Sequence, residues 1–201
     1  MQRYDDRTAL VVVDVQNDFA DPDGSLSVAG GEAIIPTINR EIEMAASAGA
    51  TVVFTRDWHP PSTPHFAKDG GIWPVHCVAD TWGAELHPEL AIPAGAPSIH
   101  KGISGEDGYS GFTMRHPTTG EERATGLEAL LRDNGIERVV IVGLATDYCV
   151  KATALDAERL GFDAFLLTDA IAAVDLSPGD GERAIEEMRD AGVGLWRSVM
   201  R

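Results

Sequence analysis

The chain of 201 residues contains little lysine, few cysteines and no long hydrophobic run. Its two cysteines, Cys77 and Cys149, are too few for a disulfide framework, which predicts a reducing, cytoplasmic location. Because the chain has no membrane-length apolar segment and no signal region at its start, we expect no membrane attachment. The formal net charge of −16 argues against nucleic acid or an anionic membrane surface as a partner.

Short apolar runs alternate with helical patterns along most of the chain. The apolar runs, rich in β-branched residues, predict strands, and the segments rich in Ala, Leu, Glu and Arg predict helices. The expected strands are 9–15, 51–55, 98–101, 139–142, 164–168 and 193–196, and the expected helices are 32–48, 126–134, 148–160 and 182–191. This order predicts an α/β fold, a Rossmann-like three-layer α/β/α arrangement with a central, mostly parallel sheet of about six strands. The length fits a single domain over residues 1–201.

Residues 57–97 form a long irregular segment between two expected strands. They contain seven of the eleven prolines, three of the four tryptophans and four of the six histidines. Irregular loops of this length are usually functional or disordered, and the aromatic content argues against disorder. The segment is therefore a candidate functional loop.

Cys149 lies in the most informative segment of the chain, residues 138–161. A strand there is followed by a tight turn and a helix, with Thr146 or Asp147 as the expected N-cap, so Cys149 falls in the first helical turn. Unpaired backbone N–H groups and the helix dipole favour a thiolate at this position and can receive an oxyanion. A cysteine that only packs at a helix start is the alternative interpretation.

Asp14 and Lys101 end two further expected strands. Burying such charges is costly unless they are paired. If the strands are neighbours in a parallel sheet, Asp14, Lys101 and Cys149 converge at its carboxyl edge, where ligands of such sheets bind. Asp14 can then take the thiol proton and return it to a leaving amine, while Lys101 stabilises the thiolate and the carboxylate. A structural carboxylate and a solvated surface lysine are the alternatives.

A second group of candidate residues comprises Asp57, His59, His65 and His76. An Asp-x-His pair in extended chain places both side chains on the same side. One carboxylate and up to three imidazoles suit Zn, Fe or Mn, which predicts one divalent transition metal ion per chain. Loop histidines without a ligand role are the alternative, and whether His65 is a ligand stays open.

Together these residues resemble the nicotinamidase (pyrazinamidase) branch of the isochorismatase-like cysteine hydrolase family. The resemblance runs from about residue 9 to residue 196. It rests on the motifs Val-Asp-Val-Gln-Asn-Asp-Phe, Asp-Trp-His, His-Phe, Trp-Pro-Val-His-Cys, Lys-Gly, Tyr-Ser-Gly-Phe and Gly-Leu-Ala-Thr-Asp-Tyr-Cys-Val.

The resemblance assigns a role to each candidate residue. It implies a catalytic triad, a metal site, an oxyanion hole made of two backbone N–H groups, and aromatic pocket walls. The catalytic triad would be Asp14, Lys101 and Cys149, and the metal ligands would be Asp57, His59, His65 and His76. The oxyanion hole would be formed by the backbone N–H groups of Ala145 and Cys149, and the pocket walls by Phe19, Trp73 and Tyr109. A cis peptide bond is expected between Ala145 and Thr146.

The implied activity is hydrolysis of the linear amide C–N bond of nicotinamide to nicotinate and ammonia. It would proceed through a cysteine thioester, with the metal holding the pyridine ring nitrogen, and pyrazinamide is an expected second substrate. The biological role implied by the resemblance is NAD salvage and pyridine nucleotide biosynthesis, with a small molecule as partner. The alternatives are another amidohydrolase of small amides, an isochorismatase, and a non-catalytic metal or small-molecule binding module. The metal, the choice between monomer and homo-oligomer, and the effect of Tyr148 on substrate preference stay open.

Overall fold

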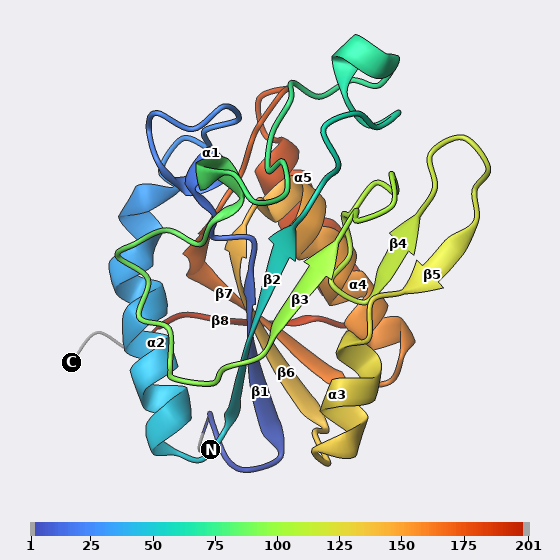
Figure 1. Cartoon of the computed structure of the whole chain (residues 1–201). Coiled ribbons are helices and arrows are strands. Elements are labelled where there is room, and N and C mark those ends of the chain that lie inside the picture. Colours follow the sequence, from blue (N-terminus) through green and yellow to red (C-terminus); the bar gives the residue numbers. More distant parts are fainter. Residues whose placement is uncertain (1–2, 199–201) are drawn as a thin grey trace.

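A central sheet of six strands organises the computed structural model, which describes residues 3–198 (Figure 1). The strand order is β3-β2-β1-β6-β7-β8, and every pairing within this sheet is parallel. The strands are β1 (Thr8–Val13), β2 (Thr51–Asp57), β3 (Ser98–Lys101), β6 (Arg138–Leu144), β7 (Asp163–Ala172) and β8 (Gly194–Trp196). The predicted six-stranded parallel sheet is confirmed.

Helices cover both faces of the sheet, which confirms the three-layer arrangement. Helix α2 (Ile35–Ser47) lies on one face, and α3 (Leu127–Asp133), α4 (Lys151–Arg159) and α5 (Asp180–Asp190) lie on the other (Figure 1). Successive β1 residues point to opposite faces, so Leu10 and Val12 pack in the α2 core and Val11 and Val13 in the other. Both faces of β1 are therefore buried, which explains its unbroken apolar sequence.

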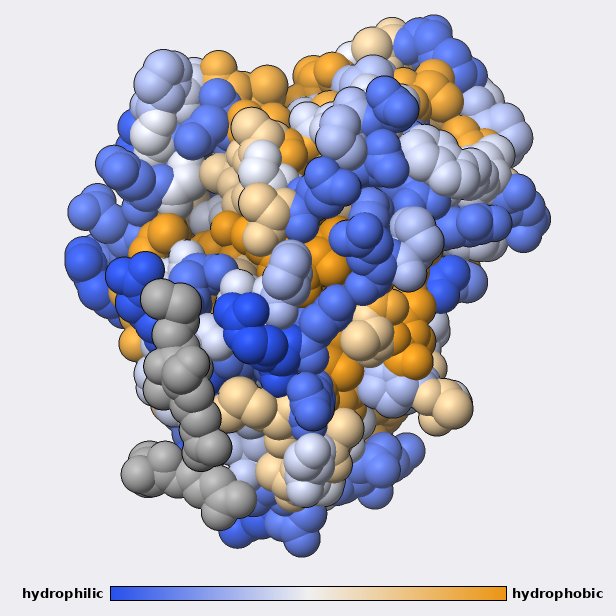
Figure 2. All heavy atoms as spheres, turned by 90° about the vertical axis from the view of Figure 1, so that its left-hand side faces the viewer, coloured by the Kyte–Doolittle hydropathy of each residue, from blue (hydrophilic) through white to orange (hydrophobic). Residues whose placement is uncertain are grey.

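Helix α2 is amphipathic. Its buried residues include Ile35, Ile38, Ile42 and Ala45, at helical spacing, and its other side faces outward. In the view onto the α2 side of the molecule, hydrophilic side chains spread over the surface, with apolar ones exposed between them mainly in the upper half (Figure 2). Within residues 3–198, no helix combines the length and apolar character needed to cross a membrane.

Several short elements were not predicted. They are α1 (Asn17–Ala20), the antiparallel hairpin of β4 (Thr113–Arg115) and β5 (Glu122–Ala124), and 3-10 turns at Ala67–Asp69 and Trp82–Ala84, whereas Glu32–Ile34, also a 3-10 turn, lies inside the helix expected over 32–48. Each is only three or four residues long, too short for a hydrophobic period to be recognised. Strand β1 also ends at Val13 and not at residue 15, because Asp14 has a φ of +50°, outside the extended region.

The chain order creates a switch point beside β1. From β1 the chain proceeds outward through β2 to β3, then returns to the other side of β1 as β6 and continues to β7 and β8. Ligands of open α/β sheets bind at the carboxyl ends of the strands beside such a point. Asp14 directly follows β1, and Cys149 lies in the turn after β6, so both flank this position.

Candidate active site

The structure brings Asp14, Lys101 and Cys149 together at the carboxyl edge of the sheet. The Lys101 Nζ atom is 2.6 Å from Asp14 Oδ2 and 3.7 Å from Cys149 Sγ. All three residues are buried. Because β2 lies between β1 and β3, the strands that carry Asp14 and Lys101 are not neighbours, and the long lysine side chain makes the connection.

Lys101 is also bound to a residue predicted only as a metal ligand. Its ammonium group contacts Asp57 Oδ1 and donates to the Gly108 carbonyl oxygen. Burial alone would lower the pKa of Lys101, but the carboxylates of Asp14 and Asp57 raise it well above its usual value. Lys101 is therefore a permanent cation that joins the two candidate groups of residues.

Asp14 is a carboxylate suited to proton transfer near neutral pH. Burial raises its pKa to about 6, while the Lys101 ammonium and a hydrogen bond of 2.6 Å from Thr55 Oγ1 oppose the rise. Its Oδ2 atom lies 2.6 Å from the Lys101 ammonium nitrogen. A general base works best when its pKa lies close to the operating pH.

Cys149 lies in a π-helical turn, Thr146–Val150, and not in the first turn of a regular α-helix. Burial raises the pKa of its thiol well above the usual value, and the Lys101 charge only partly opposes this. Loss of water outweighs the nearby cation, so the folded site favours the thiol over the thiolate that a helix-start position favours. The nucleophile needs a base beside it, which Asp14 provides.

Two expectations about this turn need correction. Ala145 occupies the N-cap position and makes no side-chain capping bond, so neither Thr146 nor Asp147 is the cap. The Asp147 carboxylate instead accepts the backbone N–H groups of Val174 and Asp175, each at 2.9 Å, because the loop after β7 packs against the turn. The cis peptide bond lies between Leu144 and Ala145, one residue earlier than expected.

The three candidate histidines form a compact, buried cluster. Ligand atoms of His59, His65 and His76 all lie within 4.8 Å of one another. Asp57 Oδ2 lies 3.5 Å from His59 Nε2 and 3.8 Å from His76 Nε2. All four predicted ligands thus meet at one place, His65 included.

The hydrogen-bond environment of these histidines suits metal ligands. His76 Nδ1 is 2.7 Å from the Pro74 carbonyl oxygen, which assigns the proton to Nδ1 and leaves Nε2 free to accept a metal. Both ring nitrogens of His59 are buried without a hydrogen-bond partner in the structure. Burial and the neighbouring His59 lower the pKa of His65 to about 3, which keeps its imidazole neutral. Neutral imidazoles beside a carboxylate are a donor set that Zn²⁺ and similar ions accept.

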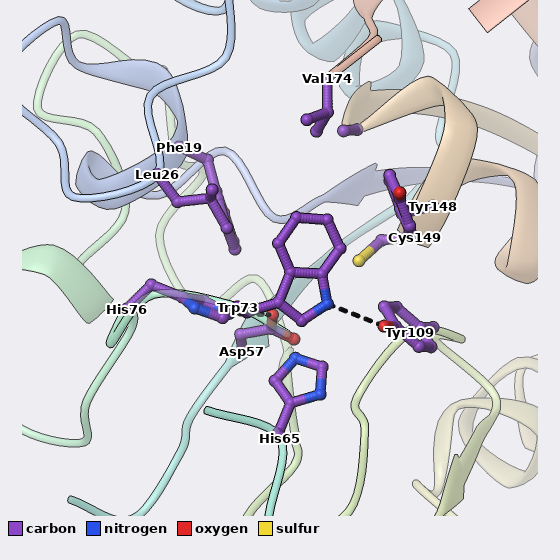
Figure 3. Close-up of a pocket in the computed structure, with 11 residues that line it drawn as sticks. Phe19, Leu26, Asp57, His65, Trp73, His76, Tyr109, Tyr148, Cys149 and Val174 are labelled. Atoms are coloured by element: carbon purple, nitrogen blue, oxygen red, sulfur yellow. Dashed lines mark hydrogen bonds and ion pairs between the residues drawn. The ribbon is translucent and has the colours of Figure 1, made fainter. Parts of the chain in front are cut away.

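One pocket is bordered by both groups of residues (Figure 3). Cys149 lies on one side of it, and Asp57, His65 and His76 lie at its base. The predicted aromatic residues Phe19, Trp73 and Tyr109 all line it, as do the predicted oxyanion residues Ala145 and Cys149. The predicted residues thus border one pocket that lies between the Cys149 thiol and the candidate metal ligands.

Three further lining residues were missed as pocket walls: Leu26, Tyr148 and Val174. Tyr148 and Trp73 meet edge to face at 4.8 Å, and Trp73 Nε1 donates to the Tyr109 hydroxyl at 2.8 Å. Val174 follows β7, so the rule that ligands lie at strand ends could have identified it. Leu26 is an aliphatic residue in a loop, and no sequence signal distinguishes it.

Known proteins are similar to this chain over nearly its whole length. Residues 8–198 match the family model of the isochorismatase domain. The nicotinamidase of Escherichia coli (strain K12) is 38% identical over 204 residues, covering 94% of this chain and 93% of the relative.

Two solved structures are similar in both sequence and fold. The pyrazinamidase of Pyrococcus horikoshii in complex with zinc is 43% identical, with a TM-score of 0.85 over 95% of this chain and 99% of that chain. The PnC1 protein of L. infantum in complex with nicotinate is 39% identical, with a TM-score of 0.85 over 95% of this chain and 92% of that chain. With this coverage and identity, the chain belongs to the isochorismatase domain family.

Proposed function

We propose that this protein is a nicotinamidase, which hydrolyses nicotinamide to nicotinate and ammonia and also accepts pyrazinamide. The observation that carries the proposal is the position of Cys149, which borders the same small aromatic pocket as the histidine cluster. The Cys149 thiol on one side of the pocket matches the carboxamide group of nicotinamide. The candidate metal ligands on the other side match its pyridine nitrogen. The named relatives, a nicotinamidase, a pyrazinamidase and a protein that binds nicotinate, support this assignment.

In the first half of the proposed reaction, Asp14 takes the proton of the Cys149 thiol, and the sulfur attacks the carboxamide carbon. Lys101, 3.7 Å from the sulfur, stabilises the negative charge that forms there. The backbone N–H groups of Ala145 and Cys149 receive the oxyanion. When the C–N bond breaks, Asp14 returns the proton to the leaving nitrogen, ammonia departs, and a thioester remains.

In the second half, water replaces ammonia in the pocket. Asp14 is again a carboxylate and removes one proton from the water as the oxygen attacks the thioester carbon. The C–S bond then breaks, the sulfur recovers a proton from Asp14, and the new carboxylic acid loses its remaining proton to solvent as nicotinate leaves. A pKa of about 6 suits Asp14 to both directions of transfer.

The residues for a metal ion fit this substrate. We propose that Asp57, His59, His65 and His76 hold one divalent ion, with zinc, iron and manganese as candidates. The unpartnered nitrogens of His59 and the free Nε2 of His76 support this proposal. When bound, the ion would supply an electrophilic contact for the pyridine ring nitrogen, which orients the carboxamide toward Cys149.

We also place this activity in the cytoplasm and in NAD salvage. Both cysteines are free thiols, as a reducing compartment favours. The product, nicotinate, is a pyridine carboxylate of the kind from which pyridine nucleotides are built.

The purified protein is expected to release ammonia from nicotinamide and from pyrazinamide. Benzamide, which has the same shape without a ring nitrogen, is the matched control and should react much more slowly. Ammonia release measured by a coupled assay checks this. Absence of turnover with nicotinamide, together with turnover of another small amide, would favour a sibling amidohydrolase.

Removal of the metal ion is expected to raise KM for nicotinamide roughly 10- to 100-fold. This corresponds to the loss of one contact with a charged group, worth about 1.5–3 kcal/mol. The rate at which iodoacetamide alkylates Cys149 should change much less, because that reaction does not use the ring. Elemental analysis, with kinetics before and after chelation, measures both effects. A metal-free protein with full activity would show that the histidines are ordinary loop residues without a ligand role.

A further inference from the structure

The residues directly after Asp14 support the metal site from behind. Gln16 is fully buried, and its side-chain amide forms hydrogen bonds with both the N–H group and the carbonyl oxygen of Asp57. The Gln16 Nε2 donates to the Asp57 carbonyl oxygen, and Oε1 accepts the Asp57 N–H, each at 2.8 Å. The same Nε2 also donates to the Ala84 carbonyl at 2.9 Å. The backbone position of one metal-ligand candidate is therefore held by Gln16.

Asp18 makes an equivalent connection to the loop of a second ligand candidate. Its Oδ2 accepts the N–H of Cys77 at 2.7 Å, and its Oδ1 accepts the N–H of Ser25 at 3.0 Å. Cys77 directly follows His76 and has a φ of +45°, a conformation that non-glycine residues adopt uncommonly. A charge-assisted bond to its N–H stabilises this conformation and thereby the direction of His76.

Asp18 is not placed to act as a metal ligand itself. Both carboxylate oxygens accept backbone N–H groups, and a Cβ added at Gly83 would lie 2.0 Å from Oδ2. The ring of the next residue, Phe19, lies 5.4 Å from the His76 ring, on the same side of the pocket (Figure 3). His76 is thus held by Phe19, by the Pro74 carbonyl and, through Cys77, by Asp18.

We propose that Asp18 is a positioning residue for the metal site, acting through Cys77 on His76, and that Gln16 acts in the same way on Asp57. This inference rests on the proposed metal-dependent function. Asp18 must be a carboxylate, because two N–H donors point at it. An asparagine can accept only one of them and would turn its own NH₂ group toward the other.

The test is Zn²⁺ affinity of Asp18→Asn, measured by competition with a chromophoric chelator on metal-stripped protein. We expect a 10- to 100-fold loss, roughly what removal of a partner behind a metal ligand costs. The visible spectrum of added Co²⁺ should change as well, because it reports the geometry of the ligands. The matched control is Asp147→Asn, whose wild-type carboxylate also accepts two backbone N–H groups and is equally buried, at 7% exposure against 8% for Asp18. This control should keep its Zn²⁺ affinity and Co²⁺ spectrum.

A second variant keeps the inference testable if Asp18→Asn does not fold. Gly83→Ala leaves Asp18 chemically intact but pushes its carboxylate away from Cys77, so Zn²⁺ affinity should fall in the same direction. Unchanged Zn²⁺ affinity in a folded Asp18→Asn or Gly83→Ala protein would overturn the positioning role alone. An equal loss in Asp147→Asn would also overturn it, since the effect would then be general destabilisation. A wild-type protein that binds no Zn²⁺ would overturn both this role and the proposed metal site.

Discussion

Cys149→Ala is expected to reduce kcat for nicotinamide by about 10,000-fold or more, while nicotinamide binding stays largely intact. The thiol forms the covalent intermediate, so without it the two-step route is closed. The pocket walls and the histidine cluster do not depend on the sulfur, which borders only one side of the cavity. Stopped-flow or steady-state ammonia release measures kcat, and calorimetric titration with nicotinamide measures binding.

The other cysteine is the control for this prediction. Cys77 is fully buried, does not line the pocket, and places its Sγ 3.7 Å from the Gly83 carbonyl oxygen. Cys77→Ala should therefore keep most of the activity. Substantial turnover by Cys149→Ala would rule out the thioester route, and an inactive but folded Cys77→Ala protein would assign Cys77 a role that the geometry does not suggest.

Asp14→Asn is expected to reduce kcat by roughly 100- to 10,000-fold, the range that loss of a general acid–base produces. Asparagine cannot take the Cys149 proton, and the high thiol pKa leaves little thiolate without that transfer. The substitution also removes one of the two carboxylates that neutralise Lys101, so the variant should unfold at a lower temperature. Ammonia release and thermal unfolding measure the two effects.

The pH profile distinguishes loss of a base from loss of stability. Asp14 acts as a base only when ionised, and burial places its pKa at about 6. In the wild type, kcat/KM should therefore fall as the pH drops through about 6, tenfold for each pH unit below it. Asp14→Asn should lose this acidic limb and keep only its low residual rate. The same acidic limb in the variant would show that another group titrates there.

The convergence of the catalytic residues could be predicted because it follows from local pattern and one topological rule. Apolar runs marked the strands, and Asp14 and Lys101 were charges at their carboxyl ends. In a parallel sheet all such ends lie on one edge, so no long-range detail was needed. The histidine cluster could be predicted as far as its donor types, because Asp57 and His59 are close in the chain.

The protonation state of the thiol could not be predicted in the same way. A pKa depends on how much water is excluded, and that depends on packing between segments far apart in sequence. The helix-start position of Cys149 favoured a thiolate, whereas burial of the folded site favours the thiol. The link from Lys101 to Asp57 likewise required the register of β3 against β2, which pairs these two residues directly.

The amino-acid sequence by itself determined the strand order along the chain, the reactive side chains and their meeting at one edge of the sheet. These depend on periodicity and residue type, which are local properties. Only the tertiary structure decided the pocket wall at Leu26, the preference for the protonated thiol, and the hydrogen bonds by which Gln16 and Asp18 support the segment that carries the candidate metal ligands. Each of these depends on loops that pack together across the fold, because burial and hydrogen-bond partners exist only once distant segments meet.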